Sequence, residues 1–158
     1  MTASQALPEP RLERVADCII DVAPPLDIGQ TAVGRRRLIP ITGGSVNGPL
    51  LFAKVLPGGA DFQLITSATN ASIQARYVLQ TPEGEQIYLE NTGIRVAPAE
   101  VVQRINQGLP VDPALVYFRS TPRFETAAPR WAWLMDCIFV GTGARHPTHV
   151  ELSFFCVR

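Results

Sequence analysis

Four residues have the types needed for acid/base chemistry on a small carbonyl compound. Asp61, Arg76, Tyr117 and Arg119 each lie in a segment that we expect to form a β-strand. An arginine in a partly closed site can clamp a carboxylate or enolate oxygen through two hydrogen bonds. A tyrosine beside a cation can donate or relay a proton, and a carboxylate can act as a general base. We take these four as the candidate catalytic residues; the competing interpretation is a structural ion pair between Asp61 and Arg76.

Other polar and aromatic residues are candidates for lining the same pocket. Tyr88 and Asn91 lie on one predicted strand, whose register leaves open which of them faces inward. Glu125 could serve as an acid or base, or as half of an ion pair at the barrel rim. Trp133 is expected either in the core or in an aromatic wall against a flat ligand.

The face that carries Tyr117 and Arg119 has two interpretations. Successive side chains of a strand point to opposite faces, so these two share a face. A dry core would not accept Arg119 unless its charge were paired. The face is therefore either exposed to solvent or part of a water-filled barrel mouth.

Three other kinds of chemistry have weaker support. His146 and His149 are two imidazoles in a loop, whereas a zinc site needs three or four ligands, so we expect no metal here. We also expect no cofactor. The run of three arginines at 35–37 alternates across a strand, so at most two of them share a face. The three cysteines have no neighbouring base, which favours buried thiols over nucleophiles.

Short strands must position these residues. Frequent glycine and proline turns divide the chain into nine segments typical of strands. A single helix is expected from Pro98 to about Gln107, ended by Gly108. The pattern predicts an all-β fold, a single antiparallel meander β-barrel of lipocalin-like outline with one short helix. Residues 1–10 are expected to be a loose arm, and residues 11–158 the barrel domain. The predicted strands are 15–22, 35–42, 50–56, 61–66, 72–80, 86–91, 116–120, 133–140 and 149–157.

Composition narrows the function classes. The chain has 158 residues, of which 46% are hydrophobic, and its 14 basic and 14 acidic residues cancel. This balance is unlike that of a nucleic-acid binder. No apolar run is long enough for a membrane-spanning helix, and the first residues lack the pattern of a secretory signal. We expect a cytoplasmic protein that binds a small molecule and no nucleic acid or membrane, and that could form a homo-oligomer.

Several motifs together resemble a known family. They are RRRLIPITGG at 35–44, LPGGADFQ at 56–63, ARY at 75–77 with Gly84, YFRSTPRFET at 117–126, and WL at 133–134 with FVG at 139–141. Together they resemble the family catalogued as domain of unknown function 3237, from about residue 14 to the C-terminus. The resemblance implies a small, single-domain, lipocalin-like β-barrel and no particular reaction.

Two positions depart from the family pattern. Gln74 stands where an acidic residue is usual, and Met135 stands where an asparagine commonly follows Trp-Leu. If both line the pocket, this chain has lost a carboxylate and an amide, which implies a more apolar ligand. We therefore include Gln74 and Met135 among the candidate substrate-binding residues.

Three functions remain open at this point. The first is a cofactor-independent acid/base enzyme (isomerase, lyase, hydratase or cyclase type) acting on a small carbonyl-bearing or aromatic metabolite. The second is a non-catalytic barrel that binds such a molecule unchanged. The third is a structural barrel that mainly self-associates.

Overall fold

The computed structural model describes residues 5–158, and its strands form one antiparallel sheet. Within these residues there is one α-helix, α1 (Ala99–Asn106), and two short 3-10 helices, η1 (Pro113–Leu115) and η2 (Pro129–Met135). The ten strands are β1 (Leu12–Val22), β2 (Leu26–Thr31), β3 (Gly34–Asn47), β4 (Ala53–Val55), β5 (Gly59–Ile65), β6 (Asn70–Gln80), β7 (Gln86–Val96), β8 (Tyr117–Thr126), β9 (Ile138–Arg145) and β10 (His149–Val157).

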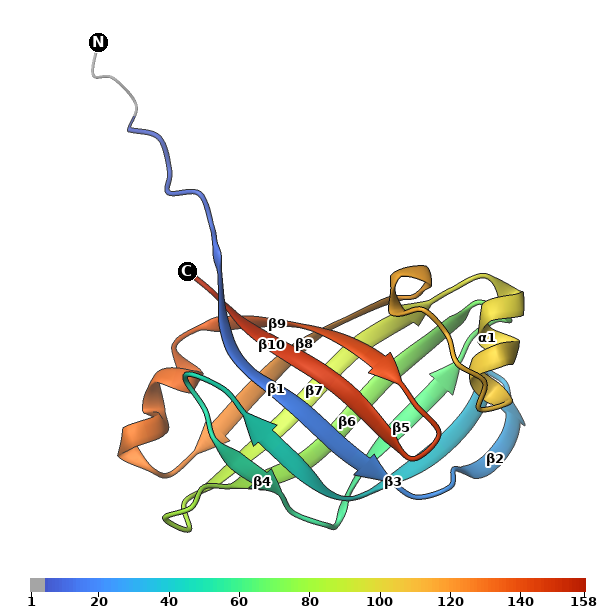
Figure 1. Cartoon of the computed structure of the whole chain (residues 1–158), viewed down its shortest axis with the longest axis horizontal. Helices are drawn as coiled ribbons and strands as arrows, with labels where there is room; N and C mark the ends of the chain where they lie inside the picture. The colour runs from blue at the N-terminus through green and yellow to red at the C-terminus, as the bar shows by residue number, and fades with distance from the viewer. Residues whose placement is uncertain (1–4) are drawn as a thin grey trace.

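The sheet closes into an eight-strand barrel with extra strands (Figure 1). β1 pairs with β10 on one side and with β3 on the other, which joins the two ends of the sheet. β4 and β5 both lie between β3 and β6, and together they fill one position of the ring. Each position of the ring is paired with its neighbours on both sides; the shortest pairing joins β8 and β9 at Arg119–Thr142 and Ser120–Gly141. The prediction of an antiparallel β-barrel is confirmed.

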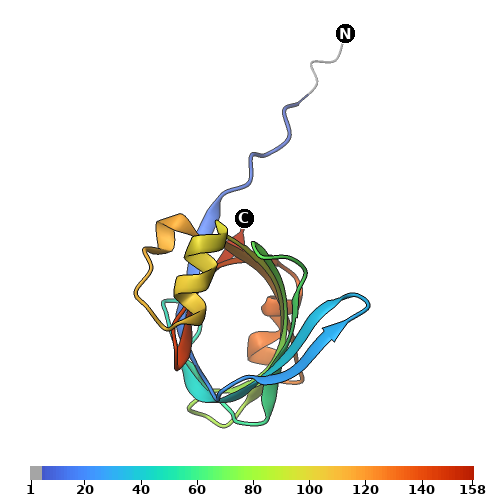
Figure 2. The ribbon, with the colours of Figure 1, turned by 90° about the vertical axis from the view of Figure 1, so that its right-hand side faces the viewer.

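β2 lies outside this ring. It pairs only with the first half of β3, and the two strands form a hairpin that projects from the barrel wall (Figure 2). The sequence analysis missed β2, because Gly29 interrupts its alternation and none of its residues is fully buried.

The predicted helix is confirmed as α1, which lies at the rim of one barrel end in Figure 2. Pro98 precedes it, and Gly108 follows with a φ of 71°, a left-handed conformation that favours glycine. Among the described residues, no helix is both long and apolar enough to cross a membrane.

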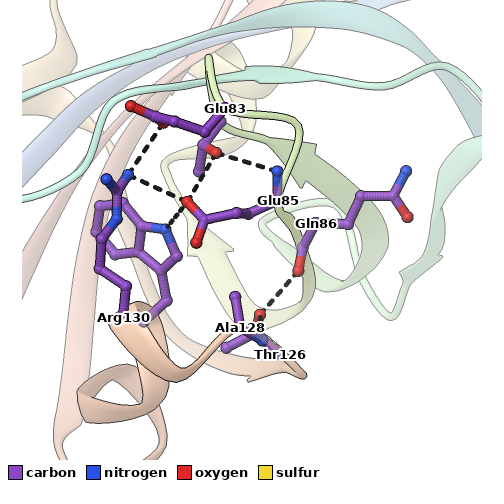
Figure 3. Close-up of polar contacts among 8 residues, drawn as sticks. Glu83, Glu85, Gln86, Thr126, Ala128 and Arg130 are labelled. Carbon is purple, nitrogen blue, oxygen red and sulfur yellow. Dashed lines mark hydrogen bonds and ion pairs between the residues drawn. The ribbon is translucent and has the colours of Figure 1, made fainter.

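The predicted strand 133–140 was wrong in its first half. Residues 129–135 form η2, and β9 begins only at Ile138. Pro129 suits the first turn of a helix, and η2 is fastened to the β6–β7 turn by polar contacts (Figure 3). The Arg130 guanidinium lies 3.1 Å from both Glu83 and Glu85, and the Trp131 indole donates to Glu85 over 2.9 Å.

The N-terminal arm was predicted over residues 1–10, of which 1–4 lie outside the described residues. Residues 5–10 form no helix or strand and extend away from the barrel (Figure 1), whereas the Arg11 backbone already exchanges hydrogen bonds with Arg158.

The hydrophobic core fills the barrel on the side of η2. Its largest members come from several strands and from η2, and they are fully or almost fully buried. Phe124 packs edge-on against Phe139 and Phe154, with ring centroids 5.0 and 6.2 Å apart. Other core residues include Leu51, Leu79, Ile87, Leu89 and Leu134.

Candidate active site in the barrel lumen

The inner face of β7 changes from apolar to polar along its length. Ile87 and Leu89 belong to the dry core, whereas Asn91 and Arg95, which have the same parity, are polar and still buried. β7 runs toward α1, so the polar half of the lumen lies at the α1 end (Figure 1). Burying amides and guanidinium groups is costly, so this half of the interior is not built for stability alone.

A cavity occupies this polar half of the lumen. The space open to the centres of water-sized molecules is about 50 Å³, and the total unfilled space, including solvent at the opening, is about 520 Å³. A cavity of this size suits a small ligand. The wall is mostly aliphatic, from residues such as Ile20, Ile41 and Ile73. Its polar members are Asp61, Gln63, Tyr77, Asn91, Arg95 and Arg145.

Four buried polar atoms of this wall have no hydrogen-bond partner among residues 5–158. They are Gln63 Oε1, the Tyr77 hydroxyl, Asn91 Oδ1 and one guanidinium nitrogen of Arg145. An unpaired polar group costs about 1–3 kcal/mol when it is buried. Burial also raises the pKa of Tyr77 well above its ordinary value, so its hydroxyl stays a neutral hydrogen-bond donor. These atoms can offer hydrogen bonds to a molecule in the cavity.

Asp61 is the carboxylate among the residues that line this cavity. Its Oδ1 accepts a hydrogen bond of 2.9 Å from the Gln74 backbone N–H, which fixes the side chain. Burial raises the pKa of Asp61, while this hydrogen bond and the charges of nearby arginines oppose the rise. In the strand register Asp61 lies opposite Ala75, and Ala75 lies opposite Asn91, so a small residue separates the two polar ones.

Three arginines surround the α1 end of the cavity. Burial and the charges of Arg145 and Arg37 lower the pKa of Arg95 to about 10, so it remains charged at neutral pH. Burial also lowers the pKa of Arg145 and of Arg37. Over residues 5–158, none of the three lies within 4.0 Å of a carboxylate oxygen. Asp61 interacts with all three arginines and Asp27 also acts on Arg37, so positive charges outnumber negative charges at this end of the lumen.

A second cavity of about 340 Å³ adjoins the first under α1. Arg95 lines both cavities, and Arg37 lines the second together with Arg35, as the alternation at 35–37 predicts. Arg36 is on the other face, where it donates to the Phe62 carbonyl oxygen over 3.2 Å. Arg95 thus contributes to both cavities, and the second cavity adds two further arginines beside it.

The structure does not bring the four predicted catalytic residues together. Asp61 lines the lumen, but Arg76, Tyr117 and Arg119 have exposed side chains on the outer face of the barrel. Arg119 donates to Thr142 Oγ1 over 3.0 Å and lies 5.1 Å from the Tyr117 ring centroid. The solvent-exposed interpretation of this face is therefore the one observed.

Strand alternation explains the position of Arg76. Its neighbours Ala75 and Tyr77 point inward and are buried, so Arg76 points outward. Its Nε lies 3.7 Å from Glu90, a partner on the same outer face. The competing interpretation, an ion pair between Arg76 and Asp61, is not seen among residues 5–158.

The predicted binding residues also separate. Asn91 lines the lumen, whereas Gln74 and Glu125 are exposed on the outer face. Tyr88 is half-buried on that face, and its hydroxyl donates to Glu90 over 2.7 Å. These placements follow from the alternation of side chains along β6, β7 and β8: the buried positions face the lumen, and the positions between them face outward.

Trp133 and Met135 lie in η2 rather than on a strand. Trp133 is half-buried and packs against Phe139, with ring centroids 6.0 Å apart, which supports the packing interpretation. Met135 is 48% exposed. Neither lines the cavity described above.

Gln63, Tyr77, Arg95 and Arg145 line the cavity but were not predicted as site residues. Arg95 lies beyond the predicted end of its strand at residue 91, although it continues the parity of Asn91. Tyr77 shares a face with Ile73 and Leu79, which is typical of a core residue. A longer strand reaching Val96 would have placed Asn91 and Arg95 on one inward face.

Comparison with known proteins identifies the family. The family model described as "Protein of unknown function (DUF3237)" matches residues 10–157. A UPF0311 protein of Rhodopseudomonas palustris is 48% identical over 125 residues, which cover 79% of this chain and 82% of that protein.

Solved structures share the barrel. The crystal structure of a conserved protein of unknown function from R. palustris superposes with a TM-score of 0.92 at 39% identity, covering 96% of this chain and all of that one. A beta-barrel like protein from Acinetobacter baumannii superposes with a TM-score of 0.85 at 37% identity, covering 97% and 99%. The motifs, the matched family model and the shared barrel together show that this chain belongs to the DUF3237 family.

Proposed function

We propose that this protein is a cofactor-independent acid/base enzyme that acts on a small, carbonyl-bearing organic acid in the lumen. One observation carries the proposal: a carboxylate, an unpaired tyrosine hydroxyl, two unpaired amide oxygens and two arginines converge on one cavity. Each has a role in proton transfer next to a carbonyl group. The small cavity favours a compact substrate.

The arginines favour an anionic substrate. Besides burial, the charges of Arg145 and Arg37 lower the pKa of Arg95, and the charge of Arg37 lowers the pKa of Arg145, so these three cations repel one another. A carboxylate bound among them would offset that repulsion and form charge-assisted hydrogen bonds. Binding of the substrate carboxylate by the arginines at the α1 end would hold the reacting carbon near Asp61.

Asp61 is the proposed proton-transfer group. As the carboxylate it would remove a proton from the carbon next to the substrate carbonyl, and the electron pair of the C–H bond would form an enolate. The Tyr77 hydroxyl and the Arg95 guanidinium would stabilise the enolate oxygen. Return of the proton to another carbon gives an isomerase, and expulsion of a leaving group gives a lyase. The raised pKa of Asp61 makes its carboxylate a stronger base.

An exchange assay tests this proposal. The protein is incubated in D₂O with small oxo- and hydroxy-carboxylic acids, and mass spectrometry follows deuterium uptake and product formation. We expect Asp61→Asn to lower the rate by about 10²–10⁴-fold, the usual contribution of a general base. Glu125→Gln is the matched control, because it neutralises an exposed carboxylate on the outer face. An undiminished rate in Asp61→Asn would refute the role of Asp61.

A binding protein is the second candidate. The wall of the cavity is largely aliphatic, with Ile20, Ile39, Ile41, Ile73 and Leu152 among its residues. Such a wall suits retention of an apolar metabolite without reaction. Recovery of a bound compound unchanged, with no deuterium uptake, would favour this function. For either function we propose a cytoplasmic location, which is consistent with three free cysteines.

A further inference from the structure

We propose that His146, His149 and Glu151 form a binding site for a divalent transition-metal ion of the zinc type. The site is independent of the lumen proposal. It lies at the β9–β10 hairpin, on the short turn that joins Arg145 to His149. One ligand atom from each of the three residues lies within 4.8 Å of the other two.

The separations suit a shared ion better than hydrogen bonds. His146 Nε2 lies 3.4 Å from one Glu151 oxygen, and His149 Nε2 lies 3.7 Å from the other. Charge-assisted hydrogen bonds between such groups are about 2.7–2.9 Å long. Two ligand atoms bound tetrahedrally to zinc at about 2.0–2.1 Å are about 3.3 Å apart. Binding of one ion by all three side chains requires a closing movement of Glu151 and rotation of one imidazole ring, because a ring-nitrogen lone pair lies in the plane of its ring.

The nitrogen of His146 gives an independent indication. Its Nε2 is buried, and it has no hydrogen-bond partner of good geometry within the described part of the chain, despite the nearby Glu151. The two imidazole rings are stacked, with centroids 4.6 Å apart and planes 17° from parallel.

The hairpin holds these groups in place. The His146 backbone N–H donates to the His149 carbonyl oxygen over 2.9 Å, which closes the turn. His149 Nδ1 lies 3.3 Å from Thr148 Oγ1, and donation from Nδ1 leaves the lone pair on Nε2 for a metal. His149 and Glu151 are two residues apart on β10, so their side chains leave the strand on the same face.

The charges around the site partly balance. Asp21 lies opposite His149 on β1 and contributes a second negative charge near the site. Arg145 precedes His146, but its side chain lines the lumen cavity. His146 also lines a groove of about 250 Å³ beside α1 and η1, together with Arg145. Two imidazoles, one carboxylate and a water make a common open zinc site.

The test is zinc titration of the tag-free protein by calorimetry, followed by Co²⁺ loading and visible spectroscopy. The chain contains only two histidines, so imidazole binding must occur here. We expect one ion per chain and the visible absorption of tetrahedral Co²⁺. His146→Ala, His149→Ala and Glu151→Gln should each weaken zinc binding by about tenfold or more.

Two control variants distinguish zinc held by these three ligands from zinc attracted by a neighbouring charge or thiol. Asp21→Asn removes a neighbouring charge but no proposed ligand, so it should weaken binding much less than Glu151→Gln. Cys137→Ser removes the most accessible thiol, and binding should persist. Thermal melts of all variants confirm that each is folded. Failure of the wild-type protein to bind zinc, or unchanged binding in the three ligand variants, would overturn the proposal.

Discussion

Replacing Tyr77 with phenylalanine should make the ligand-free protein more stable. The Tyr77 ring is buried in the core, but its hydroxyl has no partner within residues 5–158. Such a group costs about 1–3 kcal/mol, whereas losing a satisfied hydrogen bond would cost about 1 kcal/mol. Tyr77→Phe should therefore raise the free energy of unfolding by up to about 1–3 kcal/mol. For a domain of this size the rise in Tm is about 2–4 °C per kcal/mol.

The chain offers a matched control for this measurement. Tyr88 is half-buried on the outer face, and its hydroxyl donates to Glu90 over 2.7 Å. Tyr88→Phe should lower the free energy of unfolding by up to about 1 kcal/mol. Urea denaturation and calorimetry of both variants give the comparison. A loss of about 1 kcal/mol or more in Tyr77→Phe would show that the hydroxyl is paired in the folded protein, and would refute this reasoning.

Two further predictions concern stability. The folded-state pKa of Asp61 is raised above its ordinary value of 3.8, so the stability it contributes is fully present below pH 3.8 and is lost as pH rises through the folded pKa. Asp61→Asn should remove this loss. Urea melts should then show a higher free energy of unfolding for Asp61→Asn than for wild type at neutral pH, and this difference should disappear below pH 3.8. A difference that stays constant with pH would contradict the prediction. A Cβ at Gly93 would lie 2.5 Å from the Arg119 carbonyl oxygen, whereas one at Gly43 would meet nothing closer than 3.8 Å. Gly93→Ala should cost about 1–3 kcal/mol and Gly43→Ala much less, and equal melting temperatures would be evidence against this packing.

Much of the barrel could be predicted from turns and alternation. Pro57 to Gly59 and Pro82 to Gly84 separate strands correctly, because their backbone preferences are local. The alternation at 73–79 also groups Ile73, Ala75 and Tyr77 on one face, as observed. Local preferences are less informative for 133–137, where anchoring of η2 to the β6–β7 turn depends on contacts distant in sequence.

The site was harder to predict than the fold, because alternation gives two faces and does not say which one is inside. The lumen is part hydrophobic core and part polar pocket. Tyr77 has aliphatic neighbours on its face of β6, so the sequence pattern assigns Tyr77 to the core. Arg76 lies between Ala75 and Tyr77 and is the most obvious polar candidate for the site on this strand, but its side chain points outward. Asp61 and Asn91 were identified, and the arginines that surround them come from strand ends that sequence patterns define poorly.

The most direct test of the lumen site is a thermal-shift comparison of the wild-type protein with Arg95→Met and Arg119→Met. The ligands are small oxo- and hydroxy-carboxylic acids. A ligand at about 100 times its dissociation constant adds about 2.7 kcal/mol of stability, which is several degrees for this domain. We predict that Arg95→Met abolishes the shift and that Arg119→Met, on the outer face, retains it. Loss of the shift in Arg119→Met with retention in Arg95→Met would contradict the lumen site and would favour the residues on the outer face.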